Sequence, residues 1–293
     1  MSVGSVFIRV GGLRAGWRLL IWLAIFLGVA TGISVFIIKV FHPGAGAFLD
    51  PTRLIAGDVL ITFLPASIAT FAMAAVERRT LRDYYVPTPG SFGRQFWWGA
   101  LWGFLAVSLL VGMIAALGGY KIIGVEAKGS SLAHWAVLWI AASLVIGVVE
   151  EFTFRAYLLR TLAEGIGFWP AAALLSFGFG ALHYFTKPYE RWEDFASTGL
   201  LGFFLCLTIG RTGTLAFAIG WHAAFDWGAI YLYSGRNAGE FAVGHLLKTE
   251  WSGPDSLTGG MLGPEASWFV FAVIALLFLL FDLAYRRKEG AQP

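Results

Sequence analysis

Apolar segments about 20 residues long recur along the whole sequence, and they constrain the fold more than any other feature. They lie at residues 19–40, 54–76, 96–117, 133–158, 168–186, 195–210, 213–233 and 266–285. Twenty residues of α-helix rise roughly 30 Å, which is the thickness of the hydrocarbon core of a bilayer. Only helices and closed barrels satisfy their backbone hydrogen bonds inside lipid. The pattern therefore predicts an all-α, polytopic membrane bundle of about eight transmembrane helices.

The composition excludes the soluble classes of protein. Hydrophobic residues make up 58% of the chain, charged residues only 13%, and the mean hydropathy is +0.72. Soluble domains carry about twice that charged fraction. The net charge of +3 is small and comes without a basic soluble domain, so we expect no nucleic-acid partner. The single cysteine, Cys206, lies in an apolar stretch and is expected to pack as a small apolar residue.

Arginine and lysine gather on one side of the predicted spans. They precede the first span and follow the second, the sixth and the last, at Arg9, Arg14, Arg18, Arg78, Arg79, Arg82, Arg211 and residues 286–288. Cytoplasmic loops of membrane proteins carry this excess of positive charge. We therefore predict a multi-pass protein of the cell membrane with both termini in the cytoplasm. The first span is long enough to cross the bilayer and lacks the pattern of a cleaved signal peptide, so we expect it to remain.

Three ionisable residues interrupt the fourth apolar segment: Glu150, Glu151 and Arg155. A charge inside a span costs a few kcal/mol, so such residues usually face the bundle interior or a water-filled cavity. Glu151 and Arg155 are four residues apart on one helix face and can form an ion pair. Glu150 points about 100° away from that face, so it is expected to remain free.

Two histidines in other spans lie at a depth similar to that of Glu150. His183 follows Phe179 by one helical turn in the fifth segment, and His222 precedes Asp226 by one turn in the seventh. Counted from the cytoplasmic ends of their helices, Glu150, His222 and His183 lie roughly 15, 16 and 21 Å deep. A carboxylate and two imidazoles that converge on one level from three helices predict a site inside the bundle.

The remaining polar residues in or near the spans are expected to lie outside this cluster. Asp58 and Asp282 stand near span ends and are interpreted as interfacial, while His42 and His134 flank spans and His245 lies in a loop.

The cluster allows two routes to an activated water molecule. In one, Glu150, His183 and His222 bind a divalent ion such as zinc, which lowers the pKa of bound water. In the other, Glu150 and His183 act directly as general base, while His222 and its neighbour donate to the oxyanion. The residues alone leave both routes open. The sequence holds neither a G-x-S-x-G nor an H-E-x-x-H motif, which argues against a serine hydrolase and a standard zincin helix.

Three motifs on successive spans resemble those of a known family. EEFTFR at 150–155 fits EExxxR, FGALH at 179–183 fits FxxxH, and HAAFD at 222–226 fits a histidine followed four residues later by Asn or Asp. This pattern resembles the CPBP family of intramembrane proteases, which groups type II CAAX prenyl endopeptidases with bacterial bacteriocin-processing and self-immunity proteins. The resemblance covers residues 133–230 well and extends weakly to ERRTLRDYYV and LTGGMLGPEAS, which are typical of bacterial members.

The resemblance implies a role for each matching residue. Glu150 would activate water with help from His183, and His222 with Asp226 would stabilise the oxyanion. Supporting roles would fall to Glu151, Arg155 and, as a packing residue, Phe179. Asparagine is commoner than aspartate at position 226, and an ionised aspartate cannot donate a hydrogen bond. Protonation of Asp226, orientation of His222 and metal binding are the alternatives for its role.

The resemblance also divides the chain. Residues 131–233 would form a catalytic core, preceded by the first three transmembrane helices at 1–130 and followed by an extracytoplasmic loop and the last helix at 234–293, all within one structural domain.

The function expected from these observations is that of an intramembrane endopeptidase. A site about 15 Å deep favours a hydrophobic peptide that is membrane-embedded or lipid-anchored, so we expect the partners to be such a substrate and membrane lipids. One divalent metal ion, zinc, is the only cofactor that the cluster suggests. The alternatives are a non-catalytic immunity or partner-binding protein with the same fold, and a proton-coupled transporter. A transporter would be expected to have inverted repeats, and none is found in the sequence.

Overall fold

The chain folds into helices along most of its length. The computed structural model describes residues 8–9, 12–42, 47 and 49–286. Its α-helices are α2 (Ala15–Phe41), α3 (Pro51–Gly57), α4 (Leu64–Glu77), α5 (Pro89–Ala116), α6 (Ser130–Thr153), α7 (Leu159–Ile166), α8 (Phe168–Thr186), α9 (Trp192–Thr212), α10 (Ala216–Asp226), α11 (Asp255–Thr258) and α12 (Phe269–Ala284). The structure also contains two short 3₁₀ turns, η2 (Leu81–Tyr84) and η5 (Pro264–Ala266).

Short π-helical segments join several of these helices into longer rods. Segment η1 (Asp58–Phe63) joins α3 to α4, η3 (Phe154–Leu158) joins α6 to α7, and η4 (Trp227–Leu232) extends α10. The first two rods therefore run without a break over 51–77 and 130–166.

The predicted all-α membrane bundle is confirmed. Helices coincide with all of the predicted apolar segments. Within the described part of the chain, five rods are long and apolar enough to cross a membrane: Ala15–Phe41, Pro51–Glu77, Gly93–Ala116, Ser130–Ile166 and Trp192–Thr212. The other three predicted segments correspond to α8, α10 with η4, and α12, which are shorter or less apolar.

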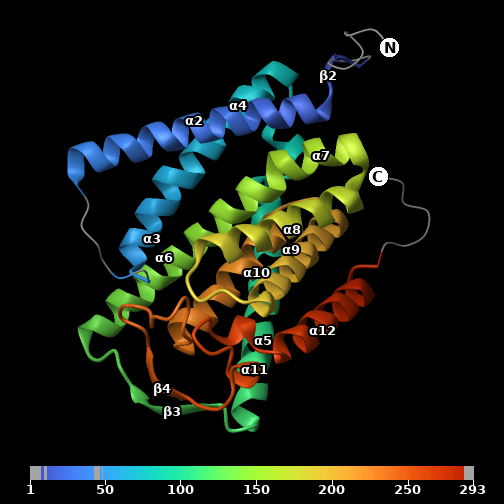
Figure 1. Ribbon diagram of the computed structural model, residues 1–293. Helices are drawn as coiled ribbons and strands as arrows, with labels where there is room; N and C mark the ends of the chain where they lie inside the picture. Colours follow the sequence, from blue (N-terminus) through green and yellow to red (C-terminus); the bar gives the residue numbers. More distant parts are fainter. Residues whose placement is uncertain (1–7, 10–11, 43–46, 48, 287–293) are drawn as a thin grey trace.

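Helix α2 lies on the outside of the bundle, across the rod formed by α3 and α4 (Figure 1). Most of its side chains are exposed, which suits a helix that faces lipid. Trp22 is its one buried residue; the indole N–H donates to Thr70 Oγ1 of α4 at 3.0 Å, and the ring stacks on Tyr157 of η3. This anchor ties α2 to both long rods.

Helices α5 and α10 pack with their backbones in close contact. A Cβ added to Gly99 or Gly103 of α5 would overlap the backbone of α10, and one added to Gly220 of α10 would overlap the Phe96 carbonyl of α5. Small residues allow this approach between membrane helices, where dispersion contacts drive association. The packing fixes the height of α10, and therefore of the His222 side chain two residues after Gly220.

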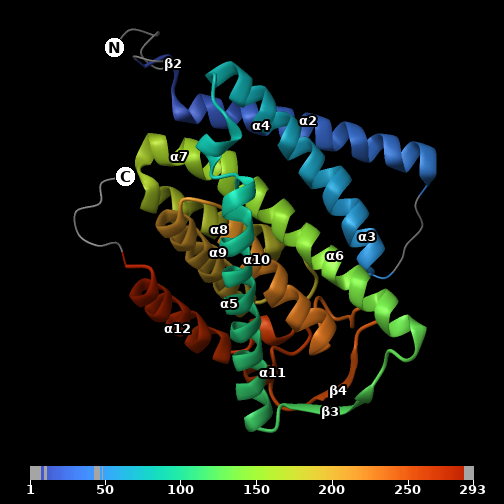
Figure 2. The ribbon, with the colours of Figure 1, turned by 180° about the vertical axis from the view of Figure 1, so that it is seen from behind.

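The two ends of the bundle differ in structure. At one end an antiparallel pair, β3 (Tyr120–Val125) with β4 (Leu247–Trp251), forms a small sheet below the helices (Figure 1). The start of α2 and the end of α12 lie away from this sheet, as the view from behind also shows (Figure 2). A second pair, β1 (Ile8–Arg9) with β2 (Gly12–Leu13), precedes α2. We refer below to the end that carries β3 and β4 as the sheet end, and to the end where Arg14, Arg18, Arg78 and Arg79 lie as the arginine end.

Candidate active site

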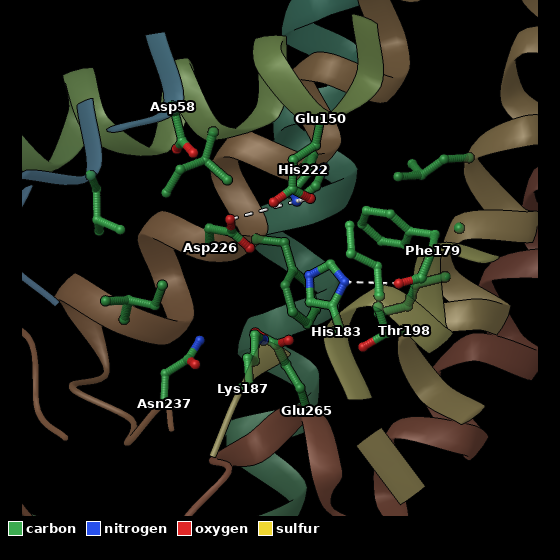
Figure 3. Close-up of a pocket in the computed structure, with 18 of the residues that line it drawn as sticks. Asp58, Glu150, Phe179, His183, Lys187, Thr198, His222, Asp226, Asn237 and Glu265 are labelled. Atoms are coloured by element: carbon green, nitrogen blue, oxygen red, sulfur yellow. Dashed lines mark hydrogen bonds and ion pairs between the residues drawn. The ribbon is translucent and has the colours of Figure 1, made fainter. Parts of the chain in front are cut away.

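A cavity of about 390 Å³ lies inside the bundle. Its walls come from the rods 51–77 and 130–166, from α8, α9 and α10, and from loops at the sheet end (Figure 3). The polar side chains that line it are Asp58, Glu150, His183, Thr186, Lys187, Thr198, His222, Asp226, Asn237 and Glu265. The cavity therefore gathers charged groups from segments that are far apart in the sequence.

Glu151 connects two of the motifs. Its carboxylate Oε1 accepts hydrogen bonds from Arg155 Nη1 at 2.6 Å and from His222 Nδ1 at 2.9 Å. The Glu151 side chain is 0% exposed and that of Arg155 is 1% exposed. A buried charge is tolerated only when its partners satisfy it, so this ion pair and the position of His222 depend on each other. Glu151 is thus more than the ion-pair partner that the spacing predicted, because it also orients an imidazole.

Glu150 faces the cavity on the other side of the helix. Its Oε2 atom lies 3.6 Å from His222 Nε2, and the side chain is 26% exposed. Within the described part of the chain this buried Oε2 atom has no hydrogen-bond partner. The prediction that Glu150 lies outside the Glu151–Arg155 pair agrees with this geometry.

Asp226 approaches the same nitrogen of His222 from one helical turn further along α10. Its Oδ2 atom lies 3.6 Å from His222 Nε2 (Figure 3). With Nδ1 hydrogen-bonded to Glu151, His222 presents only Nε2 to the cavity. Asp226 and Glu150 therefore face one ring nitrogen from two sides, while Glu151 fixes the ring through the other nitrogen.

His183 is held by its own helix. Its Nδ1 lies 2.9 Å from the Phe179 carbonyl oxygen, which can only accept, so Nδ1 is the donor and Nε2 carries the lone pair of the neutral imidazole. The Phe179 ring packs 4.5 Å from the His183 ring, centroid to centroid, and the Arg155 guanidinium lies 4.8 Å from the centroid of the same ring. Phe179 thus connects the buried ion pair to His183 through ring contacts.

A glycine on α9 makes room for this stack. A Cβ built on Gly202 would lie 2.8 Å from Arg155 Nη2 and 3.4 Å from the Phe179 ring. The first distance is shorter than side chains adopt, so any larger residue would displace the guanidinium.

All three π-helical segments adjoin ionisable residues of the site. Asp58 is the first residue of η1, Asp226 directly precedes η4, and η3 contains Arg155. A π-turn inserts one residue into the helix and rotates the following side chains, and such turns occur frequently at functional sites.

The structure corrects the interpretation of Asp58. The expectation that Asp58 is interfacial and outside the cluster is wrong, because this carboxylate lines the cavity (Figure 3). Asp58 lies eight residues into the rod 51–77, and the cavity lies toward that end of the rod. The signal was present in the sequence, since a carboxylate within a predicted span usually faces the bundle interior.

Three further lining residues were not predicted. Lys187 follows α8, and Asn237 and Glu265 come from the long segment between η4 and α12. Loops of this kind carry no periodicity that indicates where they fold, and only the tertiary structure brings them over the cavity.

The segments that bring Lys187 and Glu265 to the cavity also hold carboxylates whose pKa is raised, and we call this region the mouth of the cavity. Burial, together with the neighbouring Asp194 carboxylate, raises the pKa of Glu190 to about 8. Burial also raises the pKa of Glu265 to about 7, although Lys187 opposes the shift. Burial lowers the pKa of Lys187, but the nearby carboxylates, first that of Asp194, offset this and raise it. The mouth therefore contains groups whose charge changes near neutral pH.

The predicted zinc ligands do not form a metal site in this geometry. Among the residues that the structure describes, no group of three or more His, Cys, Asp or Glu side chains is placed to hold a metal ion. Nδ1 of His183 and Nδ1 of His222 contact a carbonyl and a carboxylate respectively, which leaves Nε2 of each ring available to the cavity. Because Glu150, His183 and His222 are not placed to share one ion, the chemistry below is derived from these side chains alone.

Comparison with known proteins agrees with the motifs. Residues 132–228 match the family model described as type II CAAX prenyl endopeptidase Rce1-like. No curated protein matches the chain. The matched segment runs from the start of α6 into η4, so it includes Glu150, His183, His222 and Asp226. The match confirms the predicted family resemblance.

Proposed function

We propose that this protein hydrolyses a peptide bond inside the membrane with water activated by Glu150 and His183. The premise is that residues 132–228 form a domain of the Rce1-like type II CAAX prenyl endopeptidases, within the CPBP family. Membership supports an intramembrane endopeptidase of the CAAX type in general. The observation that carries the finer proposal is the meeting of Glu150, His183 and His222 from three helices on one cavity.

Glu150 is suited to the role of general base. Its Oε2 atom faces the cavity without a protein hydrogen-bond partner, so the carboxylate is free to accept a proton from water. His183 presents a second acceptor, Nε2, because its Nδ1 donates to the Phe179 carbonyl. A base must lie within hydrogen-bond reach of the proton that it removes, and both acceptors border the same space.

The bond changes in the proposed reaction balance without a cofactor. The water oxygen adds to the scissile carbonyl carbon while one water proton passes to Glu150. The tetrahedral intermediate then expels the amine, and Glu150 returns the proton to the leaving nitrogen. The products are a new carboxylic acid, whose proton passes to the amine, and a new amine, and no covalent enzyme intermediate forms.

His222 is proposed to stabilise the oxyanion. In its protonated form the imidazole donates through Nε2, the nitrogen that faces the cavity, while Glu151 holds Nδ1 at 2.9 Å. A preorganised donor of this kind typically contributes about 10²- to 10³-fold to the rate. In this proposal Asp226 orients the imidazole from beside Nε2 rather than donating a hydrogen bond itself.

The substrate class follows from where the cavity lies. Apolar side chains, among them Leu182, Leu201 and Ile230, complete its walls. The cavity lies among helices that suit a lipid environment, so a peptide already held in the membrane reaches it more readily than a soluble one. We therefore propose a membrane-embedded or lipid-anchored peptide as substrate.

The test compares purified protein in detergent or liposomes on a library of membrane-anchored peptides. Glu150→Gln and His183→Ala are expected to reduce cleavage by at least about 10²-fold, as for loss of a general base. Glu250→Gln and His134→Ala remove the same side-chain types from exposed positions away from the cavity and are expected to cut like the wild type.

Chelation separates the two routes to activated water. Addition of a chelator is expected to leave the wild-type rate unchanged. Loss of cleavage that zinc restores would contradict the proposed mechanism, and equal rates for wild type and Glu150→Gln would overturn the site assignment.

A further inference from the structure

A second, larger cavity lies at the arginine end of the bundle, far from the site described above. Its volume is about 890 Å³, and it lies between the start of α2, the end of α4 and the end of α7. The charged residues that line it are Arg14, Arg18, Arg78, Arg79, Glu77 and Glu164. Four arginines thus face two glutamates, which leaves an excess of positive charge.

Two of these arginines form an ion-pair network with the glutamates. Arg18 donates to Glu77 Oε2 at 2.7 Å and to Glu164 Oε2 at 2.6 Å, and Arg79 donates to Glu164 Oε1 at 2.6 Å. The network neutralises the carboxylates and holds the walls of the cavity together. Its guanidinium groups are already occupied, so they are not the free binding groups.

Arg14 and Arg78 supply the uncompensated charge. Both side chains are exposed and line the cavity, and within the described part of the chain neither makes a hydrogen bond or an ion pair. They stand on different helices, since Arg14 directly precedes α2 and Arg78 directly follows α4. Guanidinium groups bind phosphate oxygens in a forked geometry, so two free ones beside a cavity favour a phosphate ligand.

The start of α2 adds to the positive potential. Arg14 is its N-cap residue, and within the described residues the Arg14 side chain makes no capping hydrogen bond at the start of this 27-residue helix. Gly16, in the first turn, also lines the cavity. Uncapped N–H groups at a helix start favour an anion.

An apolar groove adjoins the charged cavity. It has a volume of about 630 Å³ and is lined by Arg14, Gly16, Trp17, Leu19, Leu20, Leu23 and Leu158. Arg14 and Gly16 therefore belong to both spaces. Leu20 is 55% exposed and Leu23 is 44% exposed, on the face of α2 that is suited to lipid. A charged cavity that continues into an apolar groove fits a ligand with an anionic head and an apolar chain.

We propose that this pair of cavities binds an anionic phospholipid. The headgroup phosphate lies between Arg14 and Arg78, and one acyl chain follows α2 along Leu20 and Leu23. The bound lipid bridges the start of α2 to the end of α4. A free phosphate ion would use the arginines but leave the groove empty, so the groove favours the lipid source. The proposal is independent of the peptidase activity.

The test measures lipid retention by native mass spectrometry of the intact protein in detergent, with phosphatidylglycerol and phosphatidylcholine of equal chain length. Wild type is expected to retain phosphatidylglycerol in preference. Arg14→Gln/Arg78→Gln is expected to weaken this binding by roughly tenfold or more, because each basic residue near an anionic membrane contributes several-fold. Arg82→Gln/Arg94→Gln is the matched control. It removes the same charge at the same end of the bundle, from exposed positions that line neither cavity, and is expected to retain phosphatidylglycerol like wild type.

Competition distinguishes the two sources of phosphate. Inorganic phosphate and the deacylated headgroup, glycerophosphoglycerol, are expected to leave lipid retention unchanged at millimolar concentration. Displacement by either would assign the site to a free anion and overturn the lipid proposal. Equal retention of the two lipids by wild type, or equal loss in the two double variants, would also overturn it. Circular dichroism of each double variant checks that the helices remain folded.

Discussion

Glu77 and Glu164, at the arginine end of the bundle, have hydrogen-bond partners on both carboxylate oxygens. Glu77 accepts from Tyr157 at 2.5 Å and from Arg18 at 2.7 Å, and Glu164 accepts from Arg18, from Arg79 and from Arg160 of its own helix. Each carboxylate bridges helices that are distant in sequence. Such a network stabilises one arrangement of the rods, because an unpaired buried charge would be costly.

Carboxylates in and around the active-site cavity are arranged differently. Glu150 Oε2 is buried and has no hydrogen-bond partner in the described part of the chain, and Glu190 has a second carboxylate, Asp194, as its neighbour. Leaving a polar group buried and unpaired costs about 1–3 kcal/mol. The comparison teaches that the fold satisfies its acids where they hold helices together and leaves a carboxylate oxygen without a hydrogen-bond partner at the proposed active site.

Glu151 is the exception at the active-site end, because its Oε1 atom accepts from Arg155 and from His222 of another helix. Glu151→Gln is expected to destabilise the protein by about 3–5 kcal/mol, since it leaves Arg155 buried without a counter-charge. It also replaces the charged acceptor that orients His222 with a neutral amide, so cleavage is expected to fall sharply. Thermal unfolding in detergent and the peptide assay measure the two effects.

A double variant separates stability from orientation. Glu151→Leu/Arg155→Met replaces both charges with apolar groups and is expected to recover much of the stability but none of the activity. A double variant that cuts peptide, or a Glu151→Gln protein that unfolds at the wild-type temperature, would contradict the assigned role.

Glu77→Gln tests the arginine end. It weakens the contacts to Arg18 and Tyr157, and the expected loss of stability is about 1–3 kcal/mol. Because Glu77 lies far from the active-site cavity, the rate of cleavage below the unfolding temperature is expected to stay at the wild-type value. A loss of cleavage by the folded variant would show that the two ends are coupled and break the comparison.

The mouth of the cavity is expected to respond to pH. The pKa of Glu190 is raised from 4.5 to about 8, so the folded state keeps a proton that the unfolded state releases. Its contribution to stability is therefore present in acid and is lost as the pH rises through about 8. The raised pKa of Glu265 affects stability in the same direction, while the charge of Lys187 opposes the pKa shifts of both carboxyl groups.

Glu190→Gln sharpens this expectation. The unfolding temperature of the variant is expected to depend less on pH between 5 and 8.5 than that of wild type. The difference in unfolding temperature is expected to be smaller than the one caused by Glu77→Gln. Glu126→Gln, at an exposed position near the same end of the bundle, serves as the control. Identical pH profiles for wild type and Glu190→Gln would contradict the raised pKa.

The smallest effect is expected from Asp226→Asn. Glu151 already fixes His222 through Nδ1, and an asparagine at 226 still places an oxygen near Nε2. Cleavage is expected to change by less than about tenfold, well below the loss of a general base. A loss comparable to that of Glu150→Gln would assign Asp226 a charge-dependent role.

Much of the candidate site was predictable because its residues are ionisable side chains within apolar segments. Glu150, His183 and His222 stand out in apolar helices, and helical spacing placed Arg155 beside Glu151. Spacing along one helix could not reveal that Glu151 also binds His222, because that contact joins helices 71 residues apart in sequence.

The sequence by itself determined the class of fold and the residues that can take part in chemistry, because the period of the α-helix and the cost of charge in lipid act locally. The tertiary structure decided which of these residues meet. The close packing of α5 on α10 set the height of His222, and the fold of the loops brought Lys187 and Glu265 over the cavity. These contacts depend on shape complementarity between distant segments, which no local pattern encodes.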